Sequence, residues 1–202
     1  YLTVMNENYV HPDMPAGAEA DIIKGMYLFR EGGKEKKGMR VQLTGSGTIL
    51  REVIAAADLL RNDWGVESDI WSAPSFNELR RDGIDCERWN LLHPMDEARV
   101  PHVARCVMSK AGPVVAATDY MRIYADGVRP YIKKTYKVLG TDGFGRSDSR
   151  ENLRRFFEVN RFYVTVAALT ALADDGVIER KVVADAITKY GIDPNKPNPT
   201  TV

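Results

Sequence analysis

The sequence predicts an α/β domain of three layers, with helices on both faces of a sheet of about five mostly parallel strands and one antiparallel strand. Two observations lead to this prediction. From residue 44 onward, short β-prone segments alternate with helical ones, and such connections require parallel neighbours and right-handed crossovers. In addition, Pro113–Ala117 is apolar without alternation, as expected for a strand that helices cover on both faces.

The N-terminal part is expected to be a connection followed by a hairpin. Residues 1–20 begin with a β-prone stretch, Tyr1–Met5, and continue with turn-forming Asn and Pro residues. We interpret them as a connecting segment that follows a preceding domain of a longer chain. Met26–Phe29 and Arg40–Thr44 are short strand candidates, and the Gly- and Lys-rich stretch between them suits an antiparallel hairpin.

The middle of the chain alternates between strands and helices. A helix is expected after the GSG at 45–47, and its apolar residues recur at helical spacing on one inward face: Ile49, Leu50, Val53, Ile54, Ala57 and Leu60. The following segments are a strand at Ser68–Ser72, a helical or irregular stretch at Phe76–Leu92, a helix started by Pro101 with Val103, Val107 and Met108 inward, the strand Pro113–Ala117, a helix around Tyr120–Val128 and a last strand at Tyr136–Leu139.

The C-terminal third is expected to be helical. Asp148 is the predicted cap of one helix, with Glu151 as its capping-box partner. Asn160 is the predicted cap of the next helix, whose inward residues are expected to be Phe162, Val166, Leu169 and Ala173. A third helix around Glu179–Tyr190 is expected to end at Gly191. The predicted organisation is a connecting segment, the α/β/α domain and an extended, Pro-rich tail: residues 1–20, 21–192 and 193–202.

The composition is typical of a soluble globular domain, with 44% apolar and 28% charged residues among 202. Its 28 basic and 28 acidic side chains give no basic excess, so no nucleic-acid partner is expected. No apolar run approaches the roughly 18 residues of a membrane span, and no signal-peptide pattern stands at the N-terminus, so no membrane partner is expected.

Cys86 and Cys106 are interpreted as free thiols, with one disulfide as the alternative. The histidines are too scattered to predict a metal site: His11, His93 and His102.

The loop GTDGFGRS at 140–147 is one residue away from a phosphate-binding P-loop, because Arg146 stands where that motif has Lys. A strand before it and a capped helix after it suit anion binding. However, an Arg fork does not replace the Lys point charge in a tight cradle, and Asp142 and Asp148 would repel a polyphosphate. We therefore favour a tight turn with local charge pairs, and nucleotide binding is the alternative. Positive φ is expected at Gly140, Gly143 and Gly145.

Other candidate motifs are weaker. The GSG at 45–47 begins like a dinucleotide fingerprint but has no third Gly, and Asp69, at about the right distance to bind a ribose, lies near the start of its strand. Cys86 and His93 are close in sequence, but no third orienting group can be named for them. For their segment we favour a packing role that includes Trp89, Leu91 and Leu92.

Six stretches together carry a resemblance to a known family: MNENY (5–9), LTGSGTILREV (43–53), DGIDCERWNLLHP (82–94), ATDYM (117–121), LGTDGFGRSDSRENLR (139–154) and KVVADAI (181–187). They resemble the C-terminal domain of the homodimeric bacterial pyruvate dehydrogenase E1 component, in order and over essentially the whole chain. The resemblance implies a transketolase-like C-terminal domain, in agreement with the architecture above. It further implies a cytoplasmic bacterial parent enzyme, an oxidoreductase that depends on thiamine diphosphate, decarboxylates pyruvate and acetylates the lipoyl group of the E2 component.

The resemblance also implies where the chemistry takes place. Thiamine diphosphate and Mg²⁺ would bind to upstream domains, through a motif that opens with Gly-Asp-Gly. This chain has no Gly-Asp-Gly, and its nearest match, Asp174-Asp175-Gly176, lacks the first Gly. We therefore expect no catalytic, cofactor-binding or metal-binding residue here. The implied partners are the upstream domains of the same chain, the second E1 subunit of a homodimer and the E2 acetyltransferase.

The candidate contact surface consists of the loop motif residues Asp142, Phe144, Arg146, Ser147, Asp148 and Arg150. Arg146 and Arg150 have the longest reach, and Phe144 would be the apolar anchor. The alternative is that Asp142–Arg146 and Asp148–Arg150 are exposed internal pairs that stabilise little. The junction with the preceding domain is expected at Asn6, Glu7 and Tyr9. A second docking site for E2 or another acidic partner would be the lysine cluster Lys34, Lys36 and Lys37, which more often keeps an edge strand from pairing.

Overall fold

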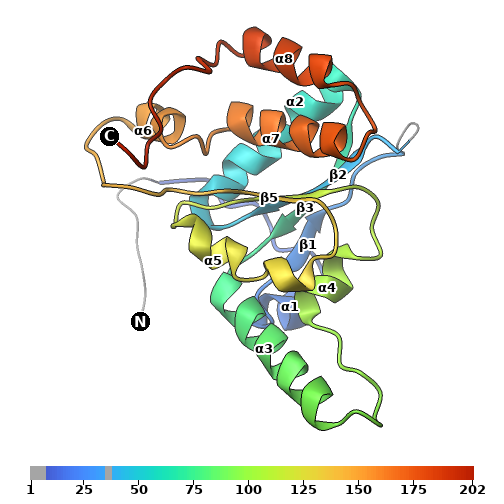
Figure 1. Ribbon diagram of the computed structural model, residues 1–202. Coiled ribbons are helices and arrows are strands. Elements are labelled where there is room, and N and C mark those ends of the chain that lie inside the picture. The colour runs from blue at the N-terminus through green and yellow to red at the C-terminus, as the bar shows by residue number, and fades with distance from the viewer. Residues whose placement is uncertain (1–7, 35–37) are drawn as a thin grey trace.

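The computed structural model describes residues 8–34 and 38–202 and contains a five-stranded sheet in the order β1-β3-β2-β4-β5. β1 runs antiparallel to β3, and the other three neighbouring pairs are parallel. The strands are β1 (Tyr27–Arg30), β2 (Arg40–Gly45), β3 (Glu67–Ser72), β4 (Val114–Ala117) and β5 (Tyr136–Leu139). The predicted mixed sheet with one antiparallel strand is confirmed (Figure 1).

Helices cover both faces of the sheet, which confirms the three layers (Figure 1). One face carries α2 (Leu50–Trp64) and α7 (Arg161–Asp174), with α6 (Arg150–Phe156) leading into α7 and α8 (Arg180–Lys189) packed on α7. The other face carries α1 (Glu19–Ile23), α3 (Phe76–Leu92), α4 (His102–Val107) and α5 (Arg122–Asp126). Two short 3-10 helices, η1 (Gly47–Ile49) and η2 (Arg129–Tyr131), complete the described elements.

The strand β4 shows why both faces must be covered. All four of its residues are buried. Val115 and Ala117 belong to the core cluster that contains α2 and α7, whereas Val114 and Ala116 belong to the cluster that contains α3 and α4. An apolar strand without alternation therefore supplies both cores, as expected for a central parallel strand.

The predicted hairpin is wrong, because β1 pairs with β3 and not with β2. Tyr27 lies opposite Ser72 in that antiparallel pair. The segment after β1 crosses the amino end of β3, where the Gly32 N–H donates to Asp69 Oδ1 and the Gly33 N–H donates to Glu67 Oε2, both at 2.9 Å. The chain then enters β2 on the far side of β3. Of the lysine cluster, Lys36 and Lys37 lie outside the described residues.

The predicted inward face of α2 is confirmed, and that of α7 is partly wrong. Ile49 at the end of η1 is buried, as are Val53, Ala57 and Leu60 of α2, and Leu50 and Ile54 pack against the same core. In α7, Leu169 is buried as predicted, but Phe162, Val166 and Ala173 are only half-buried. The reason is that α7 contacts α2, α8 and β4, so its buried face is wide and shifted: Val164, Thr165, Ala168, Leu169, Ala171 and Leu172.

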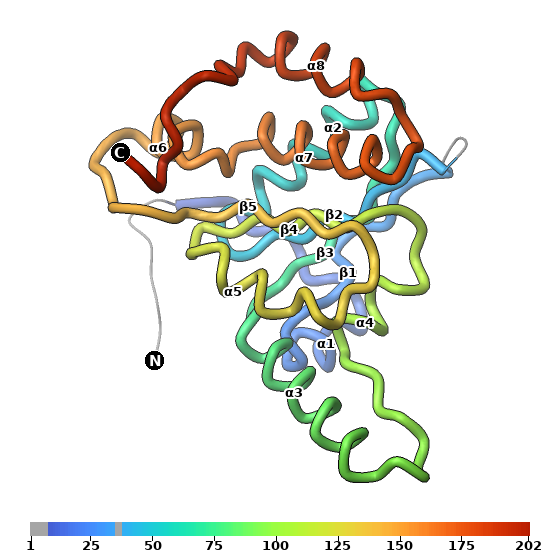
Figure 2. Tube along the Cα trace, viewed as in Figure 1, coloured from blue at the N-terminus to red at the C-terminus, as the bar shows by residue number. Residues whose placement is uncertain are grey.

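Two helices differ from the sequence-based expectation in a way that affects the surface. Helix α1 begins at Glu19, inside the stretch interpreted as irregular. Helix α3 extends away from the sheet with the loop that follows it (Figure 2). Leu91 and Leu92 at its end are exposed, so their predicted packing role is wrong, whereas Trp89 is sandwiched between the His93 ring and the Arg99 guanidinium, each at 3.5 Å.

One described stretch, Arg150–Asp174, is long and apolar enough to cross a membrane by length and composition alone. Core helices of soluble proteins pass the same test. The stretch comprises α6 and α7, and α7 contributes six buried residues to the core. The stretch is therefore weak evidence for a membrane span.

Candidate contact surface and domain junction

The motif loop, which we define as residues 140–150, lies at the carboxyl end of β5 and contacts the segment that follows β4. The Thr141 N–H donates to the Tyr120 carbonyl at 2.9 Å, and the Arg122 N–H donates to Asp142 Oδ1 at 3.1 Å. The Arg122 guanidinium also lies 3.4 Å from Asp142 Oδ2. Asp142 therefore holds two loops together, and the predicted Asp142–Arg146 pair is wrong.

The glycines of this loop have different roles. Positive φ was expected at all three, but only Gly143 has it, at +97°. Gly140 is required by close approach, because a Cβ there would lie 2.8 Å from the Tyr120 carbonyl oxygen. A Cβ at Gly145 would have no neighbouring atom within 4 Å.

Two further charged residues of the motif, Arg146 and Asp148, contact other residues of the chain. The Arg146 guanidinium lies 4.4 Å from the centre of the Phe156 ring. Asp148 accepts hydrogen bonds from the Ser149 N–H at 2.6 Å and from the Asn152 side chain at 2.9 Å. These hydrogen bonds lower the pKa of the Asp148 carboxyl. Ser147 and Arg146 border the same shallow hollow beside Phe156.

The cap of α6 is Ser149, so the prediction of Asp148 is wrong by one residue. Ser149 is extended, and its Oγ accepts from the Asn152 N–H at 3.3 Å. Since this N–H and that of Ser149 are both bound internally, the start of α6 offers little to a phosphate. The geometry does not support nucleotide binding by Gly140–Ser147. The predicted Asn160 cap of α7 is confirmed, because its Oδ1 accepts from Phe162 and Tyr163.

Large apolar side chains are exposed both on the motif loop and on the segment that follows β4, and these two segments are hydrogen-bonded to each other. Phe144 of the motif loop is 84% exposed. We call this set the edge patch: Tyr120, Met121, Ile123, Tyr124 and Phe144, all exposed. A hollow of about 260 Å³ lies beside it, between Tyr120, Tyr124 and the residues that follow β2 and β3. Large apolar side chains that are exposed on hydrogen-bonded neighbouring segments make this region a candidate interaction surface.

The sequence analysis identified only Phe144 in the edge patch. The stretch TDYMRIY contains four large apolar residues at the end of a strand, and this was the available signal. Whether such residues point inward depends on how the short helix α5 sits on the sheet, which spacing does not reveal.

The predicted junction is represented in the described part by Tyr9, whereas Asn6 and Glu7 lie outside it. The Arg51 guanidinium lies 4.6 Å from the Tyr9 ring centre and donates to the Val10 carbonyl at 3.3 Å. Arg154 donates to the Tyr9 hydroxyl at 3.3 Å. Tyr9 and Val10 therefore contact α2 and α6.

A buried carboxylate, Glu52, organises this region. Its oxygens accept from the Arg161 N–H at 2.9 Å, from the Arg161 guanidinium at 3.0 and 3.2 Å, and from Arg154 at 3.2 Å. Burial alone would raise the pKa of the Glu52 carboxyl, but the contacts with Arg161 and Arg154 outweigh burial and lower it. The signal for Glu52 was present in the sequence, because it lies three residues after Ile49 on the inward face of α2.

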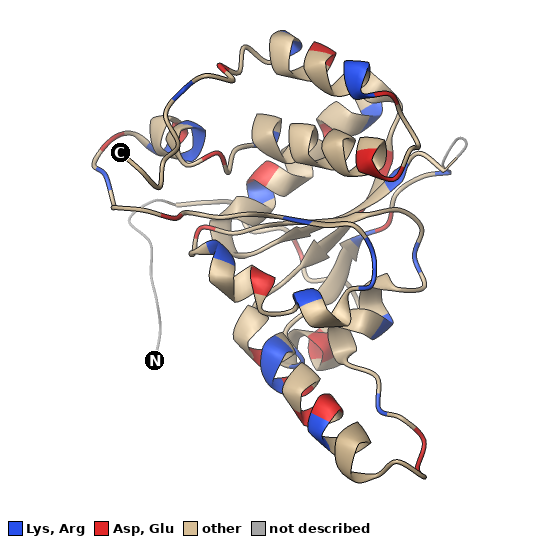
Figure 3. Cartoon of the chain, viewed as in Figure 1, with Lys and Arg blue, Asp and Glu red and all other residues tan. Residues whose placement is uncertain are grey.

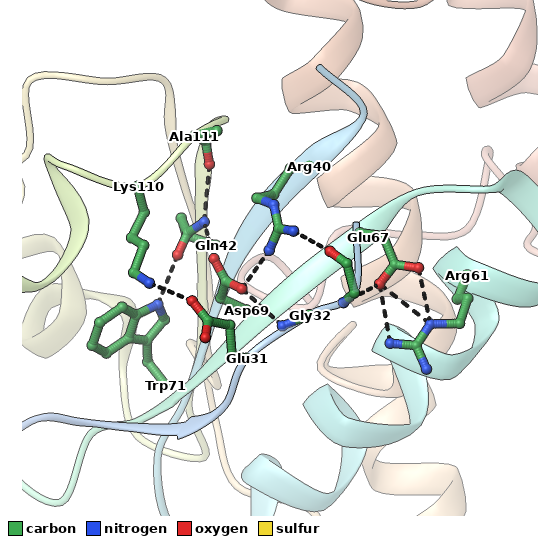
Figure 4. Close-up of polar contacts among 11 residues, drawn as sticks. Glu31, Gly32, Arg40, Gln42, Arg61, Glu67, Asp69, Trp71, Lys110 and Ala111 are labelled. Carbon is green, nitrogen blue, oxygen red and sulfur yellow. Dashed lines mark hydrogen bonds and ion pairs between the residues drawn. The ribbon is translucent and has the colours of Figure 1, made fainter. Parts of the chain in front are cut away.

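A second buried carboxylate, Asp69, lies at the opposite end of the sheet (Figure 4). It binds Arg40 at 2.5 Å and the Gln42 amide at 2.8 Å. The same Gln42 side chain accepts from the Trp71 indole at 2.8 Å (Figure 4). Asp69 lies at the amino end of β3 and is bound within the protein, so it is not placed to bind a ribose.

The two cysteines are free, as predicted. Cys106 Sγ lies 3.6 Å from His102 Nε2, which also contacts the Met26 carbonyl at 2.8 Å. Burial raises the pKa of Cys106 to about 11 and also raises that of Cys86. Both thiols are therefore protonated at neutral pH, and the described geometry contains no activated nucleophile at either cysteine.

Comparison with known proteins agrees with this architecture. Residues 25–160 match the model of the transketolase-like TK C-terminal domain. The chain is 64% identical over 202 residues to the pyruvate dehydrogenase E1 component of Cupriavidus necator, which covers 100% of this chain and 23% of the relative. It is 58% identical over 202 residues to that of Escherichia coli K12, covering 98% of this chain and 22% of the relative. The chain thus spans under a quarter of the length of these curated relatives.

Solved structures show the same fold at low sequence identity. A split-gene transketolase, described as an inactive β4 tetramer, gives a TM-score of 0.53 at 14% identity, covering 74% of this chain and 43% of that one. A transketolase from Pichia stipitis gives a TM-score of 0.51 at 15% identity, covering 82% of this chain and 20% of that one.

Proposed function

Because the chain belongs to the transketolase-like C-terminal domain family, we propose that it is the C-terminal domain of a bacterial, cytoplasmic pyruvate dehydrogenase E1 component. The supporting observation is identity of 64% and 58% to proteins of that name over essentially the whole chain. The parent protein would decarboxylate pyruvate and acetylate the lipoyl group of E2.

The described residues offer no ligand set for Mg²⁺, and the start of α6 offers little to a diphosphate. No group of three or more His, Cys, Asp or Glu side chains in this part of the chain could hold a metal ion. The N–H groups of Ser149 and Asn152 at the start of α6 are bound internally. In this proposal the cofactor binds to the upstream domains of the parent protein.

The role we assign to the chain is assembly of the parent protein. The single observation that supports this role is the edge patch, in which Phe144, Tyr120 and Ile123 are each more than 60% exposed. Large apolar side chains at the surface favour binding of a partner that removes them from water. The partner would be an upstream domain or the second subunit of a homodimer.

The test compares the complete parent protein with a version truncated before Tyr1. Pyruvate-dependent reduction of an artificial electron acceptor, with thiamine diphosphate and Mg²⁺, reports the activity, and sedimentation reports the oligomeric state. We expect activity in the complete protein and loss of both activity and oligomer after truncation. No thiamine-dependent turnover of pyruvate in the complete protein would contradict the proposal.

A further inference from the structure

A hollow of the described surface lies away from the edge patch, between the starts of α2 and α7, helix α6 and the end of α8. Its volume is about 740 Å³, within the range of small-molecule sites. We call it the arginine groove, because five arginines line it: Arg51, Arg150, Arg154, Arg155 and Arg161. Basic residues on α6 and on the start of α2 are visible in Figure 3.

The groove has a local excess of positive charge. Its five arginines face three carboxylates, those of Glu52, Asp58 and Glu151, which leaves a formal excess of two positive charges. The chain as a whole has 28 basic and 28 acidic residues, so the excess is not a consequence of composition. Asp58 is also engaged by Arg30 at 3.1 Å, and Arg30 does not line the groove.

Two of the arginines are charged but not neutralised by a carboxylate of the described chain. Arg51 donates to the Val10 carbonyl and Arg155 donates to the Gly191 carbonyl, each at 3.3 Å. A main-chain carbonyl satisfies a hydrogen bond but leaves the positive charge in place. An anion that enters the groove therefore meets two guanidiniums that keep their positive charge.

The side chains of two further arginines, Arg154 and Arg161, are ordered by contacts with a buried carboxylate. The Glu52 carboxylate is almost fully buried, and it binds both Arg154 and Arg161. The Arg154 side chain is only 15% exposed. Because these guanidiniums are already ordered, an anion that binds them loses less conformational entropy than it would on flexible surface arginines.

We propose that the arginine groove binds a small polyanionic metabolite that carries phosphate or several carboxylate groups. Guanidinium forks bind both groups through paired, charge-assisted hydrogen bonds. The aromatic residues Phe162, Tyr163 and Tyr190 line the same hollow and offer apolar surface that the carbon skeleton of a metabolite could contact. Tyr9 is one of the lining residues, so the described part of the connecting segment leaves the hollow open.

The test uses isothermal titration calorimetry on the complete parent protein, saturated with thiamine diphosphate and Mg²⁺ so that the catalytic centre is occupied. The two probes are fructose 1,6-bisphosphate, which carries phosphates, and tricarballylate, which carries three carboxylates. We expect at least one probe to bind and the affinity to fall as salt is raised. Binding of the first probe only assigns phosphate, binding of the second only assigns carboxylate, and binding of both assigns polyanions in general.

The decisive variants are Arg155→Gln and the double variant Arg51→Gln/Arg155→Gln. Each lost charge-assisted contact should weaken binding by about tenfold or more. Arg155→Gln leaves the Tyr9 contacts intact, so its effect does not depend on the connecting segment. The matched control is Arg81→Gln, an exposed arginine on α3 that pairs with Glu78.

The outcomes separate clearly. Weakened binding in the two groove variants with unchanged binding in Arg81→Gln supports the site. Ordinary metabolite sites are half-saturated at about 1 mM or less. If neither probe bound at about 10 mM, the groove would be closed in the parent protein or would not be a binding site, and the proposal would be overturned. Equal binding by all variants would place the anion elsewhere and overturn the proposal.

Discussion

The carboxylate of Glu52 binds both the main chain and the side chain of Arg161: one oxygen accepts from the Arg161 N–H at 2.9 Å and from its Nε at 3.0 Å. Helix α2 is thereby tied to the first residue of α7 through a charge that is buried under the arginine groove. The connecting segment rests on the same cluster through Arg154 and Tyr9. Loss of this one carboxylate should lower the free energy of unfolding and weaken the contacts that Tyr9 makes with Arg154.

Glu52→Gln should therefore destabilise the 202-residue chain strongly. Removing one partner of a buried ion pair costs about 3–5 kcal/mol. Because the Arg161 side chain is 45% exposed, we expect a loss below that range, about 2–3 kcal/mol. Denaturant unfolding measures the change in free energy. The control is Glu31→Gln, whose partner Lys110 is 2.7 Å away but whose side chain is 64% exposed. This control should cost less than about 1 kcal/mol, and equal losses in the two variants would contradict the role of Glu52.

The contribution of Glu52 should also depend on pH. Its pKa in the folded chain is below its unfolded value of 4.5, because the contacts with Arg161 and Arg154 outweigh the opposing effect of burial. Such a carboxyl stabilises the fold above the unfolded pKa and loses this contribution as the pH falls through the folded pKa. The stability difference between wild type and Glu52→Gln should be full at neutral pH and shrink below pH 4.5. A difference that stayed constant from neutral to strongly acidic pH would show that the charge is not responsible.

The motif loop offers a paired test of its geometry. Gly140→Ala would place a methyl group 2.8 Å from the Tyr120 carbonyl and 2.9 Å from the Arg122 N–H nitrogen. Relief of this clash must move the backbone, so we expect a loss of about 1–3 kcal/mol in unfolding free energy. Gly145→Ala meets open space and has no positive φ to keep, so it should be neutral. Thermal unfolding of both variants decides the matter: if Gly145→Ala were the more harmful change, the described loop conformation would be wrong.

The thiol of Cys106 should react slowly in the native chain. Its pKa is raised to about 11 by burial, so the reactive thiolate should be about a hundredfold scarcer at neutral pH than for an ordinary thiol. Alkylation by iodoacetamide in a Cys86→Ala background reports Cys106 alone. We expect slow reaction in the native chain, fast reaction in urea and a native rate that rises with pH. Native and unfolded rates within a factor of two would contradict the burial of this thiol.

The sequence was sufficient to predict the five strands, the buried face of α2 and the Asn160 cap, because these depend on local spacing and on side chains within one turn. The partner of β1 could not be predicted, since a four-residue strand carries no information on which neighbour it meets. The buried face of α7 was shifted for a related reason: its burial depends on α2 and α8 packing on two sides.

The candidate site was predicted only in part, for the same physical reasons. Phe144 was identified from its motif, but the α5 residues beside it were not, because their exposure depends on tertiary position. Glu52 was overlooked, although it follows Ile49 by three residues on an otherwise apolar face. The internal pair expected for Asp142 was wrong because its true partner, Arg122, comes from a segment 20 residues away.

The most direct test of the assembly role compares two single substitutions in the parent protein, Phe144→Asp and Met95→Asp. Both replace an exposed apolar residue by the same charge, since Phe144 is 84% and Met95 is 95% exposed, but only Phe144 lies in the edge patch. Sedimentation equilibrium measures the subunit dissociation constant, and the acceptor assay measures activity. We predict that Phe144→Asp raises the dissociation constant by about thirtyfold or more, as expected for a central interface residue, or abolishes activity through misplaced upstream domains, while Met95→Asp changes neither. Unchanged assembly and activity in Phe144→Asp would contradict the assignment of the edge patch as a contact surface.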